Sequence, residues 1–261
     1  MKYTLNITRK MLAPDARDAR DASEMRTKLV LRAAPGEVAW HIALKVLGYL
    51  LFMEYEPRIE EGIGWHYKPD LVSLDAEGRL RLWVDCGNIA VRKIDRVAQK
   101  VGADVPFIIL RRTQRDAQLL AQSLDKMRFP ERVHILSFDK GFVDALAEAL
   151  DATNHIRADI GPRPETRSDV PSDKRLYKNS GEHLKHRAEH RQGASTAFDT
   201  ETDGTSRTIG TDMAGATGMT SATGKTGAVP PTVSQLRHIT LHLENRKGDS
   251  ALTSAITLQQ P

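Results

Sequence analysis

Apolar side chains are distributed unevenly along the 261 residues of this chain, and their distribution limits what the chain can fold into. Most branched aliphatic and aromatic residues lie before about residue 150, whereas Gly, Ser, Thr, Ala, Asp, Arg and Pro dominate after about residue 153. A segment that buries little apolar surface cannot offset the entropy lost on folding. We therefore predict a folded domain over residues 1–155 and a low-complexity, mostly disordered tail over residues 156–261. An edge hairpin within residues 239–258 is the alternative for the end of this tail.

Hydrophobic periodicity within the first 150 residues predicts an α/β domain. Alternating apolar residues at 3–7 and 29–31 indicate short half-buried strands. Pro35 and Gly36 open a long helix that runs to about Met53, with Glu37 in its first turn. The elements expected after it are strands at 69–75 and 79–85, a helix at 90–101, a strand at 107–110, a helix at 114–127, a strand at 133–138 and a helix at 142–150. Apolar strands between helices indicate a largely parallel sheet buried on both faces, and the centre reads α-β-β-β-α-β.

Composition and charge constrain the environment of the protein and its partners only loosely. Cys86 is the single cysteine, which excludes an internal disulfide and favours a reducing compartment. The N-terminus lacks the apolar core of a secretory signal, and the apolar stretch 42–53 is shorter than the roughly 20 residues that a membrane span needs. We expect a cytoplasmic protein without membrane association. The formal net charge of +4 is compatible with a nucleic-acid partner but does not establish one.

The segment from Pro69 to Asp85 carries the most specific chemical signal. If this hairpin turns at Glu77 and Gly78, Asp70 lies opposite Asp85, Val72 opposite Trp83 and Leu74 opposite Arg81. Directly opposed residues have Cβ atoms about 5 Å apart on one face of the sheet. Two carboxylates so close resist joint ionisation unless a cation lies between them. Hard oxygen ligands with room for water suit Mg²⁺ or Mn²⁺, so we predict a metal site at Asp70 and Asp85.

Two further residues are candidate members of this site. Lys93 lies at the edge of the apolar stripe of the next helix, from which an ammonium group can reach the carboxylates and orient a water or stabilise a phosphate. An ordinary lysine that extends to solvent is the alternative. Glu37 lies on a polar stripe with His41 and Lys45, where a carboxylate that only stabilises the helix N-terminus is the alternative. We interpret His41 as a surface histidine and Cys86 as a buried core cysteine.

The order of Glu37, Pro69-Asp70, Asp85 and the following lysine resembles the PD-(D/E)XK nuclease superfamily. Within it, residues 1–150 look most similar to YaeQ-like proteins, which share Pro35-x-Glu37 before a long apolar helix, an acid followed by glycine (Asp85-Cys86-Gly87) and a basic helix with Arg92-Lys93-Ile94. The resemblance implies a restriction-endonuclease-like core in which the acids hold Mg²⁺ and the lysine assists the attacking water.

One position departs from the pattern of the superfamily. Its third motif has lysine two residues after the acid, where this chain has Gly87. Lysine migration to the following helix occurs in the superfamily, and Lys93 is then the migrated residue. The YaeQ-like group is also better defined by its fold than by a reaction.

These observations predict a Mg²⁺-dependent nuclease that hydrolyses nucleic-acid phosphodiester bonds, with Asp70, Asp85, Lys93 and Glu37 in the site. The alternative is a catalytically inactive nuclease-fold protein that binds DNA, RNA or a protein. A third interpretation is a structural or regulatory protein that binds a partner through its tail.

Overall fold

The computed structural model describes residues 1–11, 23–161, 233 and 236–261. The loop expected near residues 15–22 and most of the predicted tail, 162–232 and 234–235, lie outside these residues. The strands are β1 (Lys2–Met11), β2 (Ser23–Arg32), β3 (Arg58–Ile59), β4 (Leu71–Leu74), β5 (Leu80–Cys86), β6 (Phe107–Arg111), β7 (Val133–Phe138), β8 (Thr153–Gly161), β9 (His238–Asn245) and β10 (Gly248–Gln259). The α-helices are α1 (Ala39–Leu51), α2 (Val91–Lys100), α3 (Gln114–Leu124) and α4 (Phe142–Ala149), and the short 3₁₀ helices are η2 (Met53–Tyr55) and η3 (Pro130–Arg132).

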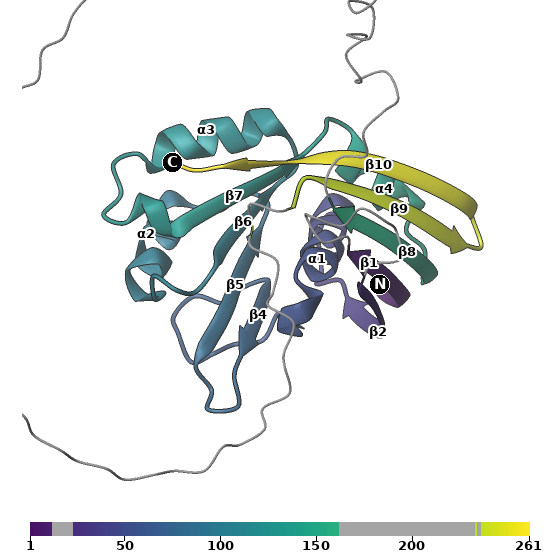
Figure 1. Ribbon diagram of the computed structural model, residues 1–261, viewed down its shortest axis with the longest axis horizontal. Coiled ribbons are helices and arrows are strands. Elements are labelled where there is room, and N and C mark those ends of the chain that lie inside the picture. Colours follow the sequence, from purple (N-terminus) through teal and green to yellow (C-terminus); the bar gives the residue numbers. More distant parts are fainter. Residues whose placement is uncertain (12–22, 162–232, 234–235) are drawn as a thin grey trace, which may run out of the picture. The chain divides into compact units, whose positions relative to one another are not determined.

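The described strands form one mixed sheet in the order β2-β1-β8-β9-β10-β7-β6-β5-β4-β3. The long strand β10 joins its two parts, because it pairs with β9 up to Ala255 and with β7 from Ile256 onward. Helix α1 lies between the two parts, so that the sheet curves around it (Figure 1). The fold is therefore mixed α/β with one large, strongly curved sheet, rather than a flat layer between helices.

Two hydrophobic cores lie on opposite faces of the central strands. Leu82 and Val84 of β5 belong to the core that contains α1 and α4, whereas Trp83 belongs to the core formed with α2 and α3. Phe107 and Ile108 of β6 divide between the same two cores. The predicted burial of these strands on both faces is confirmed. No helix among the described residues is long and apolar enough to cross a membrane.

The C-terminal boundary predicted for the domain needs correction. Strand β8 runs through residue 155 and pairs with β1 on one side and β9 on the other. The β9–β10 hairpin forms at residues 238–259, where an edge hairpin was the alternative to disorder. It lies inside the sheet and not at its edge. Leu241 and Leu243 of β9 are fully buried against the α1 core. Residues 156–161 and 236–261 therefore belong to the folded unit and not to a disordered tail.

Candidate active site at the paired ends of β4 and β5

The β4–β5 hairpin brings two acidic residues to the same end of the sheet. Leu71 pairs with Val84 and Val72 with Trp83, and this register, continued by one residue, places Asp70 opposite Asp85. The backbone N–H of Asp70 donates to the carbonyl of Val84 at 3.1 Å. The predicted pairing of Leu74 with Arg81 is wrong, because an irregularity at Ser73/Leu74 pairs Leu74 with Leu80. That irregularity lies toward the turn and leaves the register at the acidic end unchanged.

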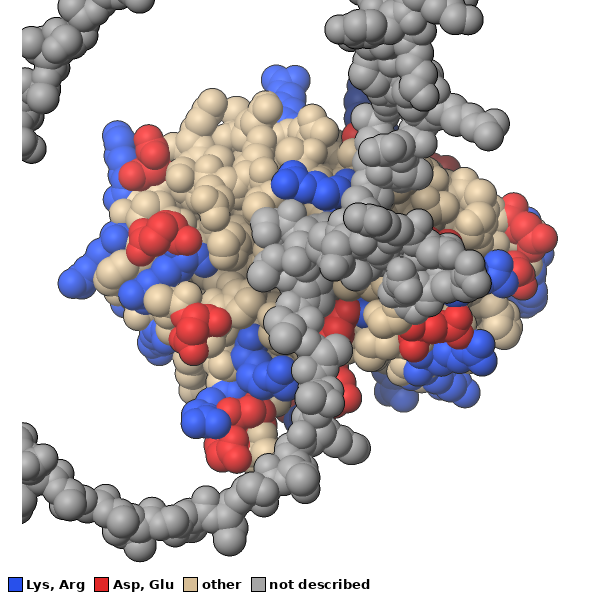
Figure 2. All heavy atoms as spheres, viewed as in Figure 1, with Lys and Arg blue, Asp and Glu red and all other residues tan. Residues whose placement is uncertain are grey.

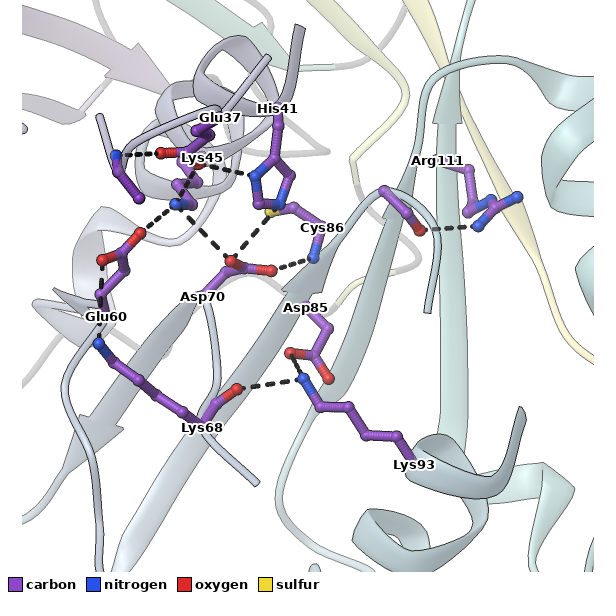
Figure 3. Close-up of polar contacts among 12 residues, drawn as sticks. Glu37, His41, Lys45, Glu60, Lys68, Asp70, Asp85, Cys86, Lys93 and Arg111 are labelled. Carbon is purple, nitrogen blue, oxygen red and sulfur yellow. Dashed lines mark hydrogen bonds and ion pairs between the residues drawn. The ribbon is translucent and has the colours of Figure 1, made fainter. Parts of the chain in front are cut away.

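Asp85 is fully buried on the face of the sheet that α2 covers. The Trp83 indole Nε1–H donates to its Oδ2 at 3.0 Å. The Lys93 ammonium donates to its Oδ1 at 2.8 Å (Figure 3). Burial raises the pKa of Asp85 above its ordinary value, although the charge of Lys93 and the indole hydrogen bond oppose this. A buried acid with a shifted pKa next to a cation is a feature of functional sites.

Lys93 extends from the first turn of α2 back over the sheet to this carboxylate. Its ammonium group also donates to the backbone carbonyl of Lys68 at 3.1 Å, in the loop that leads into Asp70. The side chain is 21% exposed and is therefore only partly buried. The structure thus brings Lys93 to Asp85, with the loop before β4 beside both.

Gly87 has a structural reason for not being lysine. Its φ is +76°, a backbone conformation that side chains with a Cβ rarely adopt. A Cβ at this position would lie 2.8 Å from Cζ3 of Trp40. The backbone turn and the packed indole together disfavour a side chain at this position, and the ammonium group that contacts Asp85 comes from Lys93 of α2.

Asp70 is less buried than Asp85 and faces the other side of the site. Its Oδ2 accepts the Cys86 N–H at 2.7 Å, and its Oδ1 lies 3.5 Å from His41 Nε2 and 3.8 Å from Lys45 Nζ. Burial alone raises the pKa of Asp70, but His41, the Cys86 amide and Lys45 outweigh it and lower the pKa overall. Asp70 is therefore a carboxylate held by one backbone amide and flanked by two basic side chains.

Glu37 joins the cluster from the residues that lead into α1. It precedes the first helical residue, Ala39, so its predicted place in the first turn is corrected to the segment before the helix. Its Oε2 accepts the Ala34 N–H at 2.9 Å, and its Oε1 contacts His41 Nδ1 at 2.7 Å and also accepts from Lys45. Burial raises the pKa of Glu37, but Lys45, Ala34 and His41 outweigh it and lower the pKa overall.

Lys45 and Glu60 are members of the cluster that the sequence analysis did not identify. The Lys45 ammonium is buried between Glu37, Glu60 and Asp70, and burial lowers its pKa less than these carboxylates raise it. The sequence did contain a signal for this contact. A lysine within an otherwise apolar, buried helix needs acidic partners, because an unpaired buried charge is costly.

His41 is also part of the cluster and not a surface histidine. Its ring bridges Glu37 and Asp70 (Figure 3), with the side chain only 23% exposed. Burial lowers the pKa of His41, but the Asp70 and Glu37 carboxylates raise it above the ordinary value overall. His41 and Lys45 lie four residues apart on one face of α1, and Glu37, just before the helix, contacts both.

Cys86 belongs to the core and not to the chemistry of the site. It is buried on the α1 side of the sheet, opposite the face that carries Asp85. Burial and the nearby carboxylates raise the pKa of its thiol well above the ordinary value. A thiol that stays protonated is a poor nucleophile, which agrees with its interpretation as a core cysteine.

The oxygen atoms of the site can hold a hard divalent cation only together with ligands from outside the protein. Among the described residues, no three His, Cys, Asp or Glu side chains are grouped so as to hold a metal ion. Asp70 and Asp85 offer carboxylate oxygens at one end of the hairpin, and Mg²⁺ is commonly bound by one or two carboxylates together with waters and substrate phosphates. The two acids suit such a site if the substrate supplies further oxygen ligands.

Comparison with known proteins identifies related folds. A family described as YaeQ protein matches residues 16–163, more than half of the chain. The crystal structure of YaeQ protein from Pseudomonas syringae superposes with a TM-score of 0.52 at 9% sequence identity, covering 99% of this chain and 94% of that one. YaeQ protein from Xanthomonas axonopodis pv. citri gives a TM-score of 0.45 at 16% identity, covering 61% of this chain and 85% of that one. A search of curated proteins gave no significant match.

Proposed function

The chain belongs to the YaeQ family, and from that premise we propose that it is a Mg²⁺-dependent nuclease that hydrolyses phosphodiester bonds of nucleic acid. One observation carries the proposal. The hairpin register sets Asp70 opposite Asp85 at one end of β4 and β5, and the Lys93 ammonium lies 2.8 Å from Asp85. Two carboxylates and a partly exposed ammonium group are the groups that phosphodiester hydrolysis with a metal ion requires.

Asp70 and Asp85 are the proposed metal ligands. When bound by these acids, Mg²⁺ or Mn²⁺ would lower the pKa of a water ligand and polarise a phosphoryl oxygen. The raised pKa of Asp85 is consistent with this role, because burial disfavours the charged carboxylate and a bound cation would favour it. Asp70 is the more accessible of the two, because its side chain is 19% exposed and that of Asp85 is fully buried.

Lys93 and Glu37 have supporting roles in the proposal. The Lys93 ammonium donates a hydrogen bond to the attacking water or to a non-bridging phosphate oxygen, and the Lys68 carbonyl fixes its direction. Glu37 orients His41 and Lys45, which in turn hold Asp70. Glu37 is therefore a positioning residue and not a ligand.

The order of elements supports a restriction-endonuclease-like core for this part of the chain. Helix α1 is followed by β3, β4 and β5, which pair antiparallel, and then by α2 and β6, which is parallel to β5. This is the α-β-β-β-α-β order expected for such a core. The strands β1, β2, β8, β9 and β10 are additions to it.

A second candidate function is binding of nucleic acid without cleavage. The observation that favours it is the pairing of the acids with basic side chains of the chain itself: Lys45 and His41 face Asp70, and Lys93 faces Asp85. A cluster neutralised in this way needs no metal ion. It is then a buried salt-bridge network on a nuclease-like scaffold.

Cleavage assays distinguish the two candidates. Labelled single- and double-stranded DNA and RNA are incubated with purified protein in Mg²⁺, Mn²⁺ or EDTA. Wild type is compared with Asp70→Ala, Asp85→Ala and, as a control, Glu77→Ala, which removes an exposed acid at the other end of the same hairpin. We expect metal-dependent cleavage that both site variants abolish and the control retains. Binding without cleavage would support the second candidate. Equal cleavage by all four proteins would indicate a contaminating nuclease and contradict the proposed site.

A further inference from the structure

A pocket of aromatic and basic side chains lies beside the candidate active site. Its cavity of about 200 Å³ lies between the loop 65–67 and helix α2. The lining residues are Trp65, His66, Tyr67, Arg92, Arg96, Val97 and Lys100. For scale, a cavity of about 150 Å³ holds a benzene molecule. The pocket is thus large enough for a planar ring.

One wall of the pocket is held by the residues of the candidate site. Trp65 stacks on Trp83, with ring centroids 5.3 Å apart and planes inclined by 25°. The Trp83 indole in turn donates to Asp85. The Lys93 ammonium bonds to the Lys68 carbonyl, directly after the aromatic loop. The position of the aromatic wall is therefore tied to that of the carboxylate and the lysine.

The opposite wall is positively charged. Arg92, Arg96 and Lys100 follow one another at four-residue spacing on α2, and all three are exposed. Within the described part of the chain, none of them lies within ion-pair distance of a carboxylate, and the Lys100 ammonium lies 5.4 Å from the centre of the Trp65 ring. Figure 2 shows basic side chains, with acidic ones among them, at the left edge of the molecule where Figure 1 places α2. The three cations are thus available to an anionic ligand.

A planar apolar wall facing a row of cations matches the chemistry of a nucleotide. Aromatic rings stack on the face of any base, whereas arginine and lysine pair with the phosphates that follow it. In a duplex the base faces are covered by neighbouring bases, so this combination favours a single strand. An aromatic platform cannot be recognised from the sequence, because Trp65 and Tyr67 come from a loop and the basic residues come from a helix 25 or more residues later.

We propose that this pocket binds one nucleotide of single-stranded nucleic acid next to the candidate active site. Its base stacks against Trp65 and Tyr67, and the neighbouring phosphates pair with Arg92, Arg96 and Lys100. The inference rests on the proposed function for its substrate class, nucleic acid. It adds strand preference and a set of residues that the hydrolytic site does not include.

Binding is measured by fluorescence anisotropy with a labelled 12-nucleotide single strand in EDTA, where metal-dependent hydrolysis does not proceed. Arg96→Ala/Lys100→Ala is compared with Lys28→Ala/Lys140→Ala, which removes two exposed lysines on β2 and before α4. We expect the pocket variant to bind at least about fivefold more weakly and to lower the salt slope by about 1.4, at about 0.7 for each phosphate that is no longer neutralised. The control should stay within about twofold of wild type. Equal weakening in the two variants would overturn the proposal.

Two further measurements test the stacking component. Wild type should bind an abasic strand of the same length at least about fivefold more weakly than the normal strand. Binding should quench tryptophan fluorescence in wild type and much less in Trp65→Phe, which retains an aromatic ring on Trp83. Equal affinity for the abasic strand, or undiminished quenching in Trp65→Phe, would contradict a base at this wall.

The outcomes separate this inference from the proposed function. Loss of binding in Arg96→Ala/Lys100→Ala together with no cleavage by wild type would retain the pocket and reject hydrolysis. Metal-dependent cleavage by wild type together with normal binding by the pocket variant would retain hydrolysis and reject the pocket.

Discussion

At the scale of single residues, the site contains one buried acid whose pKa is raised and one accessible acid whose pKa is lowered. Asp85 is fully buried with the Lys93 ammonium on one oxygen, whereas Asp70 accepts from an amide and faces two cationic side chains. The raised pKa means that the charge of Asp85 is less stable in the folded protein than in water. A buried carboxylate that lowers the stability of the folded protein is expected at a functional site.

Substitution Asp85→Asn tests this interpretation. The neutral side chain removes the buried charge and retains an oxygen for the Trp83 indole, so we expect a Tm at or above that of wild type at pH 7. Cleavage should fall by more than about 100-fold. Loss of a residue that only hydrogen-bonds a metal ligand typically costs about 10- to 100-fold. Thermal unfolding and the cleavage assay measure the two effects. A lower Tm with unchanged cleavage would instead identify Asp85 as half of a structural ion pair.

The raised pKa of His41 predicts a pH dependence of stability. A histidine whose pKa is higher in the folded state contributes stability that is complete below its unfolded pKa of about 6.5 and is lost as pH rises through the folded value. The difference in unfolding free energy between wild type and His41→Gln should therefore be largest near pH 6 and shrink toward pH 8.5. Denaturant unfolding in EDTA measures it. The contribution of His134, whose pKa burial lowers, cancels in this difference. A difference that grows with pH would contradict the assigned contacts.

At the scale of elements, the connection from β5 to α2 determines where the cation of the site originates. Gly87 turns the backbone with a positive φ under the Trp40 ring, and Lys93 then follows in the first turn of α2. The Gly87 carbonyl also accepts from Arg111 at the end of β6. The connection thus has a fixed conformation next to Asp85.

Gly87→Ala should destabilise the protein more than Gly78→Ala, which is a matched control. Both glycines have positive φ, but a Cβ at Gly78 meets no atom within 4 Å. We expect each alanine to cost about 1 kcal/mol for its backbone conformation, and Gly87→Ala to cost a further 1–3 kcal/mol or so for the contact with Trp40. Chemical denaturation measures both. Trp40→Leu in the Gly87→Ala background should recover part of the loss, and equal costs at the two glycines would show that the indole leaves room for a side chain.

The elements of the centre could be predicted from the sequence because each has its own apolar period. Helices α1 to α4 and strands β4 to β7 form within a few residues of their expected positions. Strand β8 was not expected as a strand, because its burial depends on pairing with β1 and β9, which are distant in sequence. The ion pairs of Lys45 were not predicted for the same reason, because its partners Glu60 and Asp70 come from other elements. Local pattern thus predicted the hairpin and the candidates Lys93 and Glu37, but not the contacts that Lys45 and Glu60 make in the cluster around Asp70.

At the scale of the whole described fold, the C-terminal hairpin completes the sheet. Strand β9 pairs with β8 and strand β10 with β7, so the hairpin connects the strands around β1 to those that carry the site. Ile239, Leu241 and Leu243 of β9 pack into the core that contains α1. The fold of the candidate site therefore depends on residues about 150 positions after Asp85.

Leu241→Asp should unfold the protein, whereas the neighbouring His242→Asp should be tolerated. Leu241 is fully buried and His242 is exposed, although both lie in the middle of β9. The buried aspartate removes apolar packing and introduces an unpaired charge, at a cost of more than about 3 kcal/mol. Circular dichroism and thermal unfolding report the effect. Equal behaviour of the two variants would mean that the hairpin is not part of the core.

The most direct test of the central claim is calorimetric titration of Mn²⁺. Wild type, Asp70→Asn and Asp85→Asn are titrated in the presence of a phosphorothioate single strand, which supplies substrate oxygens and resists hydrolysis. Glu77→Ala serves as the control. We predict one Mn²⁺ site in wild type and in the control, and none in either aspartate variant. No Mn²⁺ binding in wild type, or equal binding in all four proteins, would contradict a metal site at Asp70 and Asp85.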